Sequence, residues 1–284
     1  MKIEKYDNIK PPEKIYERNT NGKILYIRHG KTEFNILQQK FGSENVKTLG
    51  KYTDGILNDE GKEQAKSAQK IINNFQIEKV YCSPLRRTLE TCLLIFENHP
   101  EKNNIIVEVC PYITELVNCA YDIPKYIEDN KKEYNLNSKI KFDWSNFDKY
   151  FKSNDEENFF YLNFIDTLSK EEIQTQFNNL VEARKKRKMS DEVSNLTIYA
   201  KEKNIKTLES FKHLFYRTLY FKKILENNHK DSLLDNQKKI IVVTHKAFIN
   251  FSTSKLAYNM KIIEKNPEDC CVTNNCEFVS LYLN

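Results

Sequence analysis

The sequence lacks any apolar run long enough to cross a bilayer, and only 6 of its 284 residues are glycine. A membrane-spanning helix needs about 20 consecutive apolar residues. Residues 1–14 are polar and charged, without the apolar segment that directs secretion. We therefore expect a chain with no membrane span, located in the cytoplasm.

The seven cysteines follow no regular spacing. Cys270, Cys271 and Cys276 lie close together near the C-terminus. The CxxC pairs typical of zinc sites are missing, and a zinc ion there would need a fourth ligand. We expect reduced thiols, as in cytosolic proteins, and no metal or cofactor.

The excess of positive over negative charge is also small, with a net charge of +5. A nucleic-acid-binding protein would be expected to show a clustered basic patch, so we predict no nucleic-acid partner. The same charge gathered in one cleft would favour an anionic substrate. The tight basic run at 184–188 is typical of a solvated helix face, with a nuclear import signal and an anion contact as alternatives.

Short apolar runs alternate with segments that suit helices. Strands are predicted at 23–28, 79–82, 105–109 and 239–244, with 278–283 closing the sheet at an edge. Helices are predicted at 58–74, at 85–96 with Pro84 in the first turn, and from residue 246 onward. Strands that alternate with helices predict a three-layer α/β/α fold with a mostly parallel central sheet.

The chain divides into three parts on this pattern. Residues 1–22 are predicted as a flexible leader, because Pro11 and Pro12 prevent a continuous helix. Residues 23–284 are predicted as one domain. Within it, residues 121–236 interrupt the alternation, contain no glycine and are rich in Lys, Glu, Asn and aromatic residues. We predict a mainly helical insertion that caps the active site at the carboxyl ends of the strands.

Reactive side chains follow the predicted strands. They are Arg28 and His29 after the first, Arg86 and Arg87 after the second, Glu115 after the third, and His245 and Lys246 after the last. Carboxyl ends of parallel strands meet at one edge of a sheet, where ligands bind. A nucleophile, cations and an acid at one edge are what phosphoryl transfer requires. The glycine after His29 would let the backbone approach a ligand closely.

Each of these residues also has an ordinary structural explanation. A lone histidine at a strand end is more often a satisfied structural residue than a nucleophile. Arg86 and Arg87 alone would be a solvated helix start, and Glu115 alone a surface carboxylate. Because two histidines, two or more arginines and a carboxylate fall at one predicted edge, we favour a phosphoryl-transfer site.

The motifs resemble the histidine phosphatase superfamily, also called the phosphoglycerate mutase-like family, and within it the phosphatase branch. Residues 28–35 are similar to its RHGxTxxN signature, and residues 83–91 to S-P-L-x-R-x-x-x-T. Glu115 fits its L-x-E segment, Glu209 with Arg217 its E-S…R helix, and His245 its second histidine. The resemblance covers residues 23–119 and 205–283.

The resemblance implies a fold, an activity and site residues. It implies a phosphohistidine formed on His29, with Glu115 as the proton donor and later the group that activates water. The residues that it assigns to the phosphate or the substrate pocket are Arg28, Arg87, His245, Thr32 and Asn35. The substrate would be a small phosphorylated metabolite or a phosphoprotein.

Two departures from the family pattern narrow the function. The mutase branch continues the glutamate as E-R-x-Y-G, whereas Glu115 is followed by Leu-Val-Asn-Cys-Ala. We therefore predict hydrolysis by a histidine acid-type phosphatase, a phosphoric monoester hydrolase. Phosphoglycerate mutase-type transfer and an inactive binding or scaffold protein are the alternatives. Lys246 stands where the family has glycine, and we hypothesise that it contacts a second anionic group of the substrate.

Overall fold

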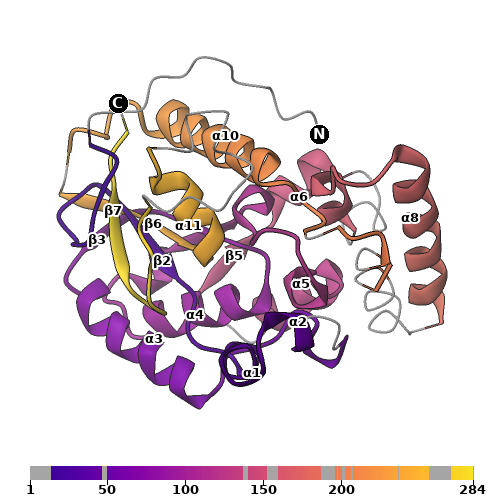
Figure 1. Cartoon of the computed structure of the whole chain (residues 1–284). Helices are drawn as coiled ribbons and strands as arrows, with labels where there is room; N and C mark the ends of the chain where they lie inside the picture. The colour runs from indigo at the N-terminus through magenta and orange to yellow at the C-terminus, as the bar shows by residue number, and fades with distance from the viewer. Residues whose placement is uncertain are drawn as a thin grey trace.

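The computed structural model describes residues 14–46, 50–136, 140–151, 159–186, 196, 198–199, 202–205, 207–235, 237–255 and 270–283. The described strands form one seven-stranded sheet with the order β1-β7-β2-β6-β3-β4-β5 (Figure 1). Their bounds are Tyr16–Glu17 (β1), Ile24–Arg28 (β2), Gln76–Cys82 (β3), Ile106–Val109 (β4), Lys141–Asp143 (β5), Lys238–Thr244 (β6) and Phe278–Leu281 (β7). Strands β2, β6, β3, β4 and β5 pair in parallel, and β7 and β1 pair antiparallel. The mostly parallel sheet that the sequence predicts is confirmed.

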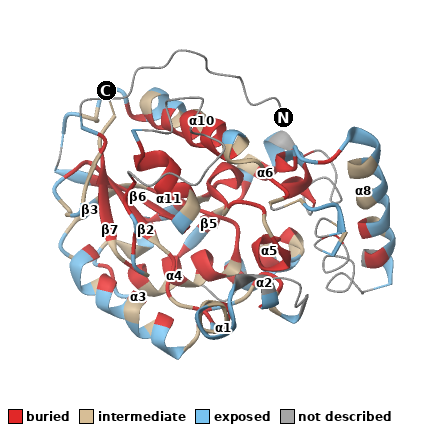
Figure 2. Ribbon diagram, in the orientation of Figure 1, coloured by how far each residue is buried: buried red, intermediate tan, exposed pale blue. Residues whose placement is uncertain are grey.

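The central strands are apolar on both faces, and this produces three layers. Leu25 and Ile27 of β2 belong to a core cluster with residues of α3 (Asp59–Ile72) and α4 (Arg86–Phe96). Ile24 and Tyr26 point the other way, into a cluster with α10 (Phe211–His229) and α11 (Lys246–Thr253). Successive strand residues face opposite sides, so each face of the sheet is covered by helices (Figure 2). The predicted α/β/α layering is confirmed.

Most predicted helices begin near their expected residues. Asn58 caps α3 by accepting a hydrogen bond from the Gly61 backbone N–H at 2.8 Å. Helix α4 begins at Arg86, so Pro84 lies before the helix. The prediction that Pro84 lies in the first turn is wrong. Leu85 is extended there, and the Asp54 carboxylate accepts the Arg86 N–H at 2.8 Å. No helix in the described ranges is long and apolar enough to span a membrane.

The first described residues extend the sheet. Residues 1–13 of the predicted leader lie outside the described residues, while Tyr16–Glu17 forms β1 and pairs with β7. Ile15 beside it is only 2% exposed. The edge strand on this side of the sheet is therefore β1. The prediction that residues 278–283 form the edge is wrong, because β7 lies one strand inside it. The division into leader, domain and insertion stays a prediction.

The predicted insertion, 121–236, is mainly helical where it is described. It holds α5 (Ile127–Leu136), α6 (Ser145–Tyr150), α8 (Lys170–Lys185) and α10. It also supplies β5, which extends the sheet parallel to β4 because Phe142 at its centre is buried in the core. Of the basic run 184–188, residues 187 and 188 lie outside the described residues, and Lys185 pairs with Glu182 on an exposed helix face.

Candidate active site

His29 follows β2 at the carboxyl edge of the sheet, where it is 2% exposed. Its backbone N–H donates to the Thr244 carbonyl at 3.0 Å, which ties it to β6. Its ring Nδ1 lies 2.7 Å from the Gly30 carbonyl oxygen. A carbonyl oxygen only accepts, so Nδ1 carries the proton and Nε2 keeps its lone pair.

The charge state of His29 follows from its surroundings. Burial lowers the pKa of His29 well below its usual value, and the nearby Arg87 and Arg28 lower it further. The ring is therefore neutral at physiological pH. A neutral imidazole with an unprotonated Nε2 is the form that attacks phosphorus.

Gly30 packs the loop after His29 against helix α3. A Cβ built on Gly30 would lie 2.6 Å from the Gly61 carbonyl oxygen, and one on Gly61 would lie 2.0 Å from the Lys31 carbonyl oxygen. The glycines therefore let the loop after His29 lie directly on α3. The close approach that was expected toward a ligand is an approach to this helix.

His245 is the N-cap residue of α11 and is fully buried. Its ring centroid lies 5.2 Å from that of His29, and its Nε2 lies 2.8 Å from the Ser83 hydroxyl. Its Nδ1 has no hydrogen-bond partner among the described residues. Burial lowers the pKa of His245 far below its usual value, as do Arg87 and His29. A buried ring nitrogen without a partner is free to bond a ligand.

Two arginines stand beside the histidines. Arg87, in the first turn of α4, is fully buried and donates to the Tyr121 carbonyl at 2.9 Å and to Asp122 Oδ1 at 3.3 Å. Its guanidinium carbon lies 4.0 Å from the centre of the Tyr121 ring. Arg28, at the end of β2, donates to the Thr273 carbonyl at 2.9 Å. The Nε atoms of both arginines are buried without a partner among the described residues.

Glu115 lies at the N-terminus of α11. Its Oε1 accepts the backbone N–H groups of Leu116 at 3.0 Å and Ala247 at 3.1 Å. Burial raises the pKa of Glu115 above its usual value, although Arg87 and Arg28 act in the opposite direction. The carboxyl thus holds a proton to higher pH than a free glutamate does.

A buried ion pair fixes the segment that carries Glu115. Arg217 binds Glu209 with two hydrogen bonds of 2.7 Å each, and both side chains are fully buried. Arg217 also donates to the Tyr112 carbonyl at 2.6 Å and to the Glu115 carbonyl at 3.3 Å. Glu209 accepts the Val117 N–H at 3.1 Å. The pair that resembles the family's E-S…R helix therefore positions the glutamate backbone.

Thr32 and Asn35 cap α1 (Glu33–Phe41). The Thr32 hydroxyl accepts the Asn35 N–H, and Asn35 Oδ1 accepts the Thr32 N–H at 3.2 Å. The Thr32 hydroxyl also lies 2.7 Å from the Tyr121 hydroxyl, whose ring stacks on Phe34. Burial raises the pKa of Tyr121 to about 12, so its hydroxyl keeps its proton. Thr32 is buried in this cap, whereas Asn35 reaches the cavity described next.

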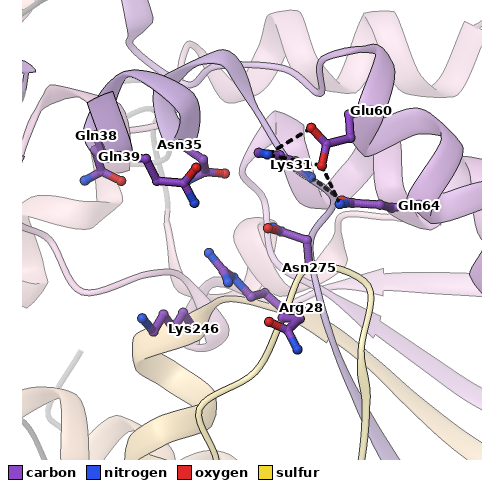
Figure 3. A pocket seen from close by; sticks show the side chains of 10 residues that line it. Arg28, Lys31, Asn35, Gln38, Gln39, Glu60, Gln64, Lys246 and Asn275 are labelled. Carbon is purple, nitrogen blue, oxygen red and sulfur yellow. Dashed lines mark hydrogen bonds and ion pairs between the residues drawn. The ribbon is translucent and has the colours of Figure 1, made fainter. Parts of the chain in front are cut away.

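A cavity of about 470 Å³ opens beside Arg28 (Figure 3). Its wall comprises Arg28 and Lys31 after β2, Asn35, Gln38 and Gln39 of α1, Glu60 and Gln64 of α3, Lys246 of α11, and Asn274 and Asn275 before β7. Three predicted site residues, Arg28, Asn35 and Lys246, thus meet here. The other five are not part of the wall. The described part of the insertion supplies no wall residue and reaches the site through Tyr121 and Asp122 beside Arg87.

Residues 24–148 match the sequence profile of the histidine phosphatase superfamily (branch 1). Over this stretch, which is less than half of the chain, the protein is similar to the histidine phosphatase superfamily. The match covers the strand ends of His29, Arg87 and Glu115, while His245 lies beyond it. The resemblance stated from the motifs is thereby confirmed.

Proteins similar to this chain include a probable phosphatase of Schizosaccharomyces pombe, which is 29% identical over 113 residues. That stretch is 39% of this chain and 49% of the relative, so the chain matches about half of its length. Among solved structures, the Bombix mori ecdysone phosphate phosphatase in complex with tungstate is 12% identical with a TM-score of 0.43, over 90% of this chain and 87% of that one. Phosphoglycerate mutase from Bacillus anthracis is 18% identical with a TM-score of 0.42, over 93% of each chain.

Several residues at the site were not singled out from the sequence. Ser83 lies in the S-P-L-x-R motif, and its hydroxyl lies 2.8 Å from His245 Nε2. Tyr121 and Asp122 open the predicted insertion and hold Arg87. Asn275 donates a hydrogen bond of 2.7 Å to the His29 carbonyl, although the two residues are 246 positions apart in the sequence. No local pattern in the sequence signals such a contact.

Proposed function

We propose that this protein is a phosphatase that hydrolyses a phosphate monoester through a phosphohistidine on His29. The observation that carries the proposal is the state of that ring. Nδ1 is held by the Gly30 carbonyl, the pKa is lowered, and Nε2 retains its lone pair near two guanidinium groups. A structural histidine would use both ring nitrogens, whereas this one keeps a nucleophilic nitrogen beside the cations that bind phosphate.

In the first step, Nε2 of His29 attacks the phosphorus and the bond from phosphorus to the ester oxygen breaks. Glu115 gives its proton to that oxygen, so the leaving group departs as an alcohol and Glu115 becomes a carboxylate. The raised pKa of Glu115 supports this role, because it keeps the proton available at the start. Arg28 and Arg87 stabilise the charge on the phosphoryl oxygens.

In the second step, a water oxygen attacks the phosphohistidine while the Glu115 carboxylate takes a proton from the water. The phosphorus–nitrogen bond breaks, inorganic phosphate leaves, and neutral His29 and protonated Glu115 are restored. His245 suits a role as hydrogen-bond donor throughout. When the Ser83 hydroxyl donates to Nε2, the His245 Nδ1 carries the hydrogen and points it to a phosphoryl oxygen.

The finer assignments belong to the same proposal. We infer a metal-independent enzyme of the histidine acid-type class, because two guanidinium groups supply the positive charge near the nucleophile. A cavity of about 470 Å³ has the size of sites for small molecules, which favours a phosphorylated metabolite over a phosphoprotein.

The test is release of inorganic phosphate from a panel of phosphorylated metabolites and phosphopeptides. His29→Ala is the control, and His29→Asn is a second one, because its amide keeps a donor toward Gly30 and has no nucleophilic lone pair. We expect hydrolysis of at least one metabolite by the natural protein and none by either variant. Equal release by the natural protein and both variants would refute the proposal. A mutase assay with 2,3-bisphosphoglycerate separates transfer to a second substrate from transfer to water.

A further inference from the structure

We infer that the cavity beside Arg28 takes a hydrophilic leaving group that carries a second anionic group, with Lys246 as its partner. This inference rests on the proposed function and specifies its substrate class. It concerns the part of the ester that departs as an alcohol, while the phosphoryl group itself belongs to His29 and the two arginines.

The wall of the cavity is polar throughout. Three of its ten residues are cations, six are amides and one is a carboxylate, and among the described residues no apolar side chain contributes to it. An alkyl or aromatic leaving group would lose water there without gaining apolar contact. Amides offer both donors and acceptors, so hydroxyl groups can replace the displaced water.

The wall keeps a net positive charge after its one carboxylate, Glu60, is paired with a lysine. Glu60 is bound by Lys31 with contacts of 2.9 and 3.1 Å, which neutralises both groups. Arg28 and Lys246 have no carboxylate within ion-pair distance among the described residues. One anionic group, the phosphoryl, uses Arg28, and a second cation is then left over.

Lys246 occupies a position that disfavours a cation. It is the first residue of α11, and the positive end of a helix dipole destabilises a positive side chain there. The side chain is nonetheless exposed in the cavity wall, with no neutralising neighbour in the described chain. A bound anion would be attracted by both the ammonium group and the helix terminus.

The arrangement of the wall fits a small bifunctional ligand. Figure 3 shows Arg28 and Lys246 on one side of the cavity, with Asn35, Gln38 and Gln39 of α1 facing them across it. A ligand whose phosphate lies by Arg28 would reach Lys246 with its second anion and the amides with its hydroxyl groups.

The experiment compares substrates that differ in one group. Glycerol 3-phosphate and 3-phosphoglycerate share a three-carbon skeleton, but the second has a carboxylate where the first has a hydroxymethyl group. Benzyl phosphate supplies an apolar leaving group. Inorganic phosphate release gives kcat/KM for each with the natural protein, Lys246→Met, Lys246→Arg and the matched surface control Lys70→Met, whose lysine is exposed on α3.

We expect the natural protein to prefer 3-phosphoglycerate over glycerol 3-phosphate by about tenfold in kcat/KM, as a charged hydrogen bond provides. Lys246→Met should bring this ratio of kcat/KM values close to one, mainly through a change in KM. Lys246→Arg and Lys70→Met should keep the ratio of the natural protein. Benzyl phosphate should be the poorest ester. A ratio near one in the natural protein, or an equal ratio in Lys246→Met and Lys70→Met, overturns the inference and leaves the proposed function standing. Absence of phosphate release from every ester overturns the proposed function itself.

Discussion

Replacing Gly61 by alanine tests how closely the loop after His29 is packed on α3. Gly61 lies in the first turn of that helix, where its N–H bonds the Asn58 side chain. At an ordinary helix position, alanine is favoured over glycine by about 1 kcal/mol. At this position a Cβ would lie 2.0 Å from the Lys31 carbonyl oxygen and 2.6 Å from its backbone nitrogen.

The size of the effect follows from those distances. Ordinary contact begins at about 3.4 Å, so the loop and the helix must separate by about 1.4 Å. Lys31 cannot move without straining the hydrogen bond from the Asn58 N–H to its carbonyl, which is 3.1 Å long. We expect a loss of about 3 kcal/mol in the free energy of unfolding, at the upper end for overpacking. Because His29 is two residues from Lys31, we also expect kcat to fall about a hundredfold.

Urea unfolding of Gly61→Ala and of the natural protein measures the first effect, and phosphate release from an accepted ester measures the second. Ser67→Ala on the exposed face of α3 is the control, with an expected change below about 0.5 kcal/mol. If Gly61→Ala were as stable and as active as Ser67→Ala, the loop would not be packed on the helix as described.

Three further predictions concern the site. Arg87→Lys should lower kcat/KM at least a hundredfold, since lysine lacks the planar fork that binds phosphoryl oxygens, and steady-state kinetics with near-natural rates would contradict this. The pH profile of kcat/KM should be bell-shaped with an acidic optimum. Activity is lost as pH falls through the lowered pKa of His29, which becomes protonated, and as pH rises through the raised pKa of Glu115, which loses its proton. A rate that keeps increasing above neutral pH would contradict these roles. Arg217→Met should cost about 3–5 kcal/mol of unfolding free energy in urea, because the buried Glu209 loses the arginine that binds both of its oxygens and keeps only His213, 2.8 Å from Oε1. A loss under about 1 kcal/mol would mean that the pair is not essential to the fold.

The sheet was predictable where the sequence pattern is strongest. Strands β2 and β6 are buried on both faces and are therefore continuous apolar runs, and Asn58 marks the start of α3 by its capping side chain. Strands β1 and β5 were not predicted, because two- and three-residue strands carry no periodic signal. Their pairing depends on neighbours that lie far away in the chain.

The meeting of residues at the site was predictable in outline and not in detail. Parallel strands bring their carboxyl ends to one edge, and this accounts for His29 and His245 lying 5.2 Å apart by ring centroid. The hydrogen bond that orients His29, the cap that buries Thr32 and the contact from Asn275 arise only when the loops are folded. The sequence therefore predicted the kinds of residue involved, while their individual contacts depend on tertiary structure.

The central claim is that phosphate is transferred to Nε2 of His29, and trapping of the phosphoenzyme tests it most directly. The protein is mixed with an accepted ester carrying labelled phosphate, quenched in alkali and digested. We predict label on the peptide that contains His29, stable to alkali and lost in acid, and absent from His29→Asn. Rapid turnover without any labelled protein, or label on a peptide that lacks His29, would contradict the account.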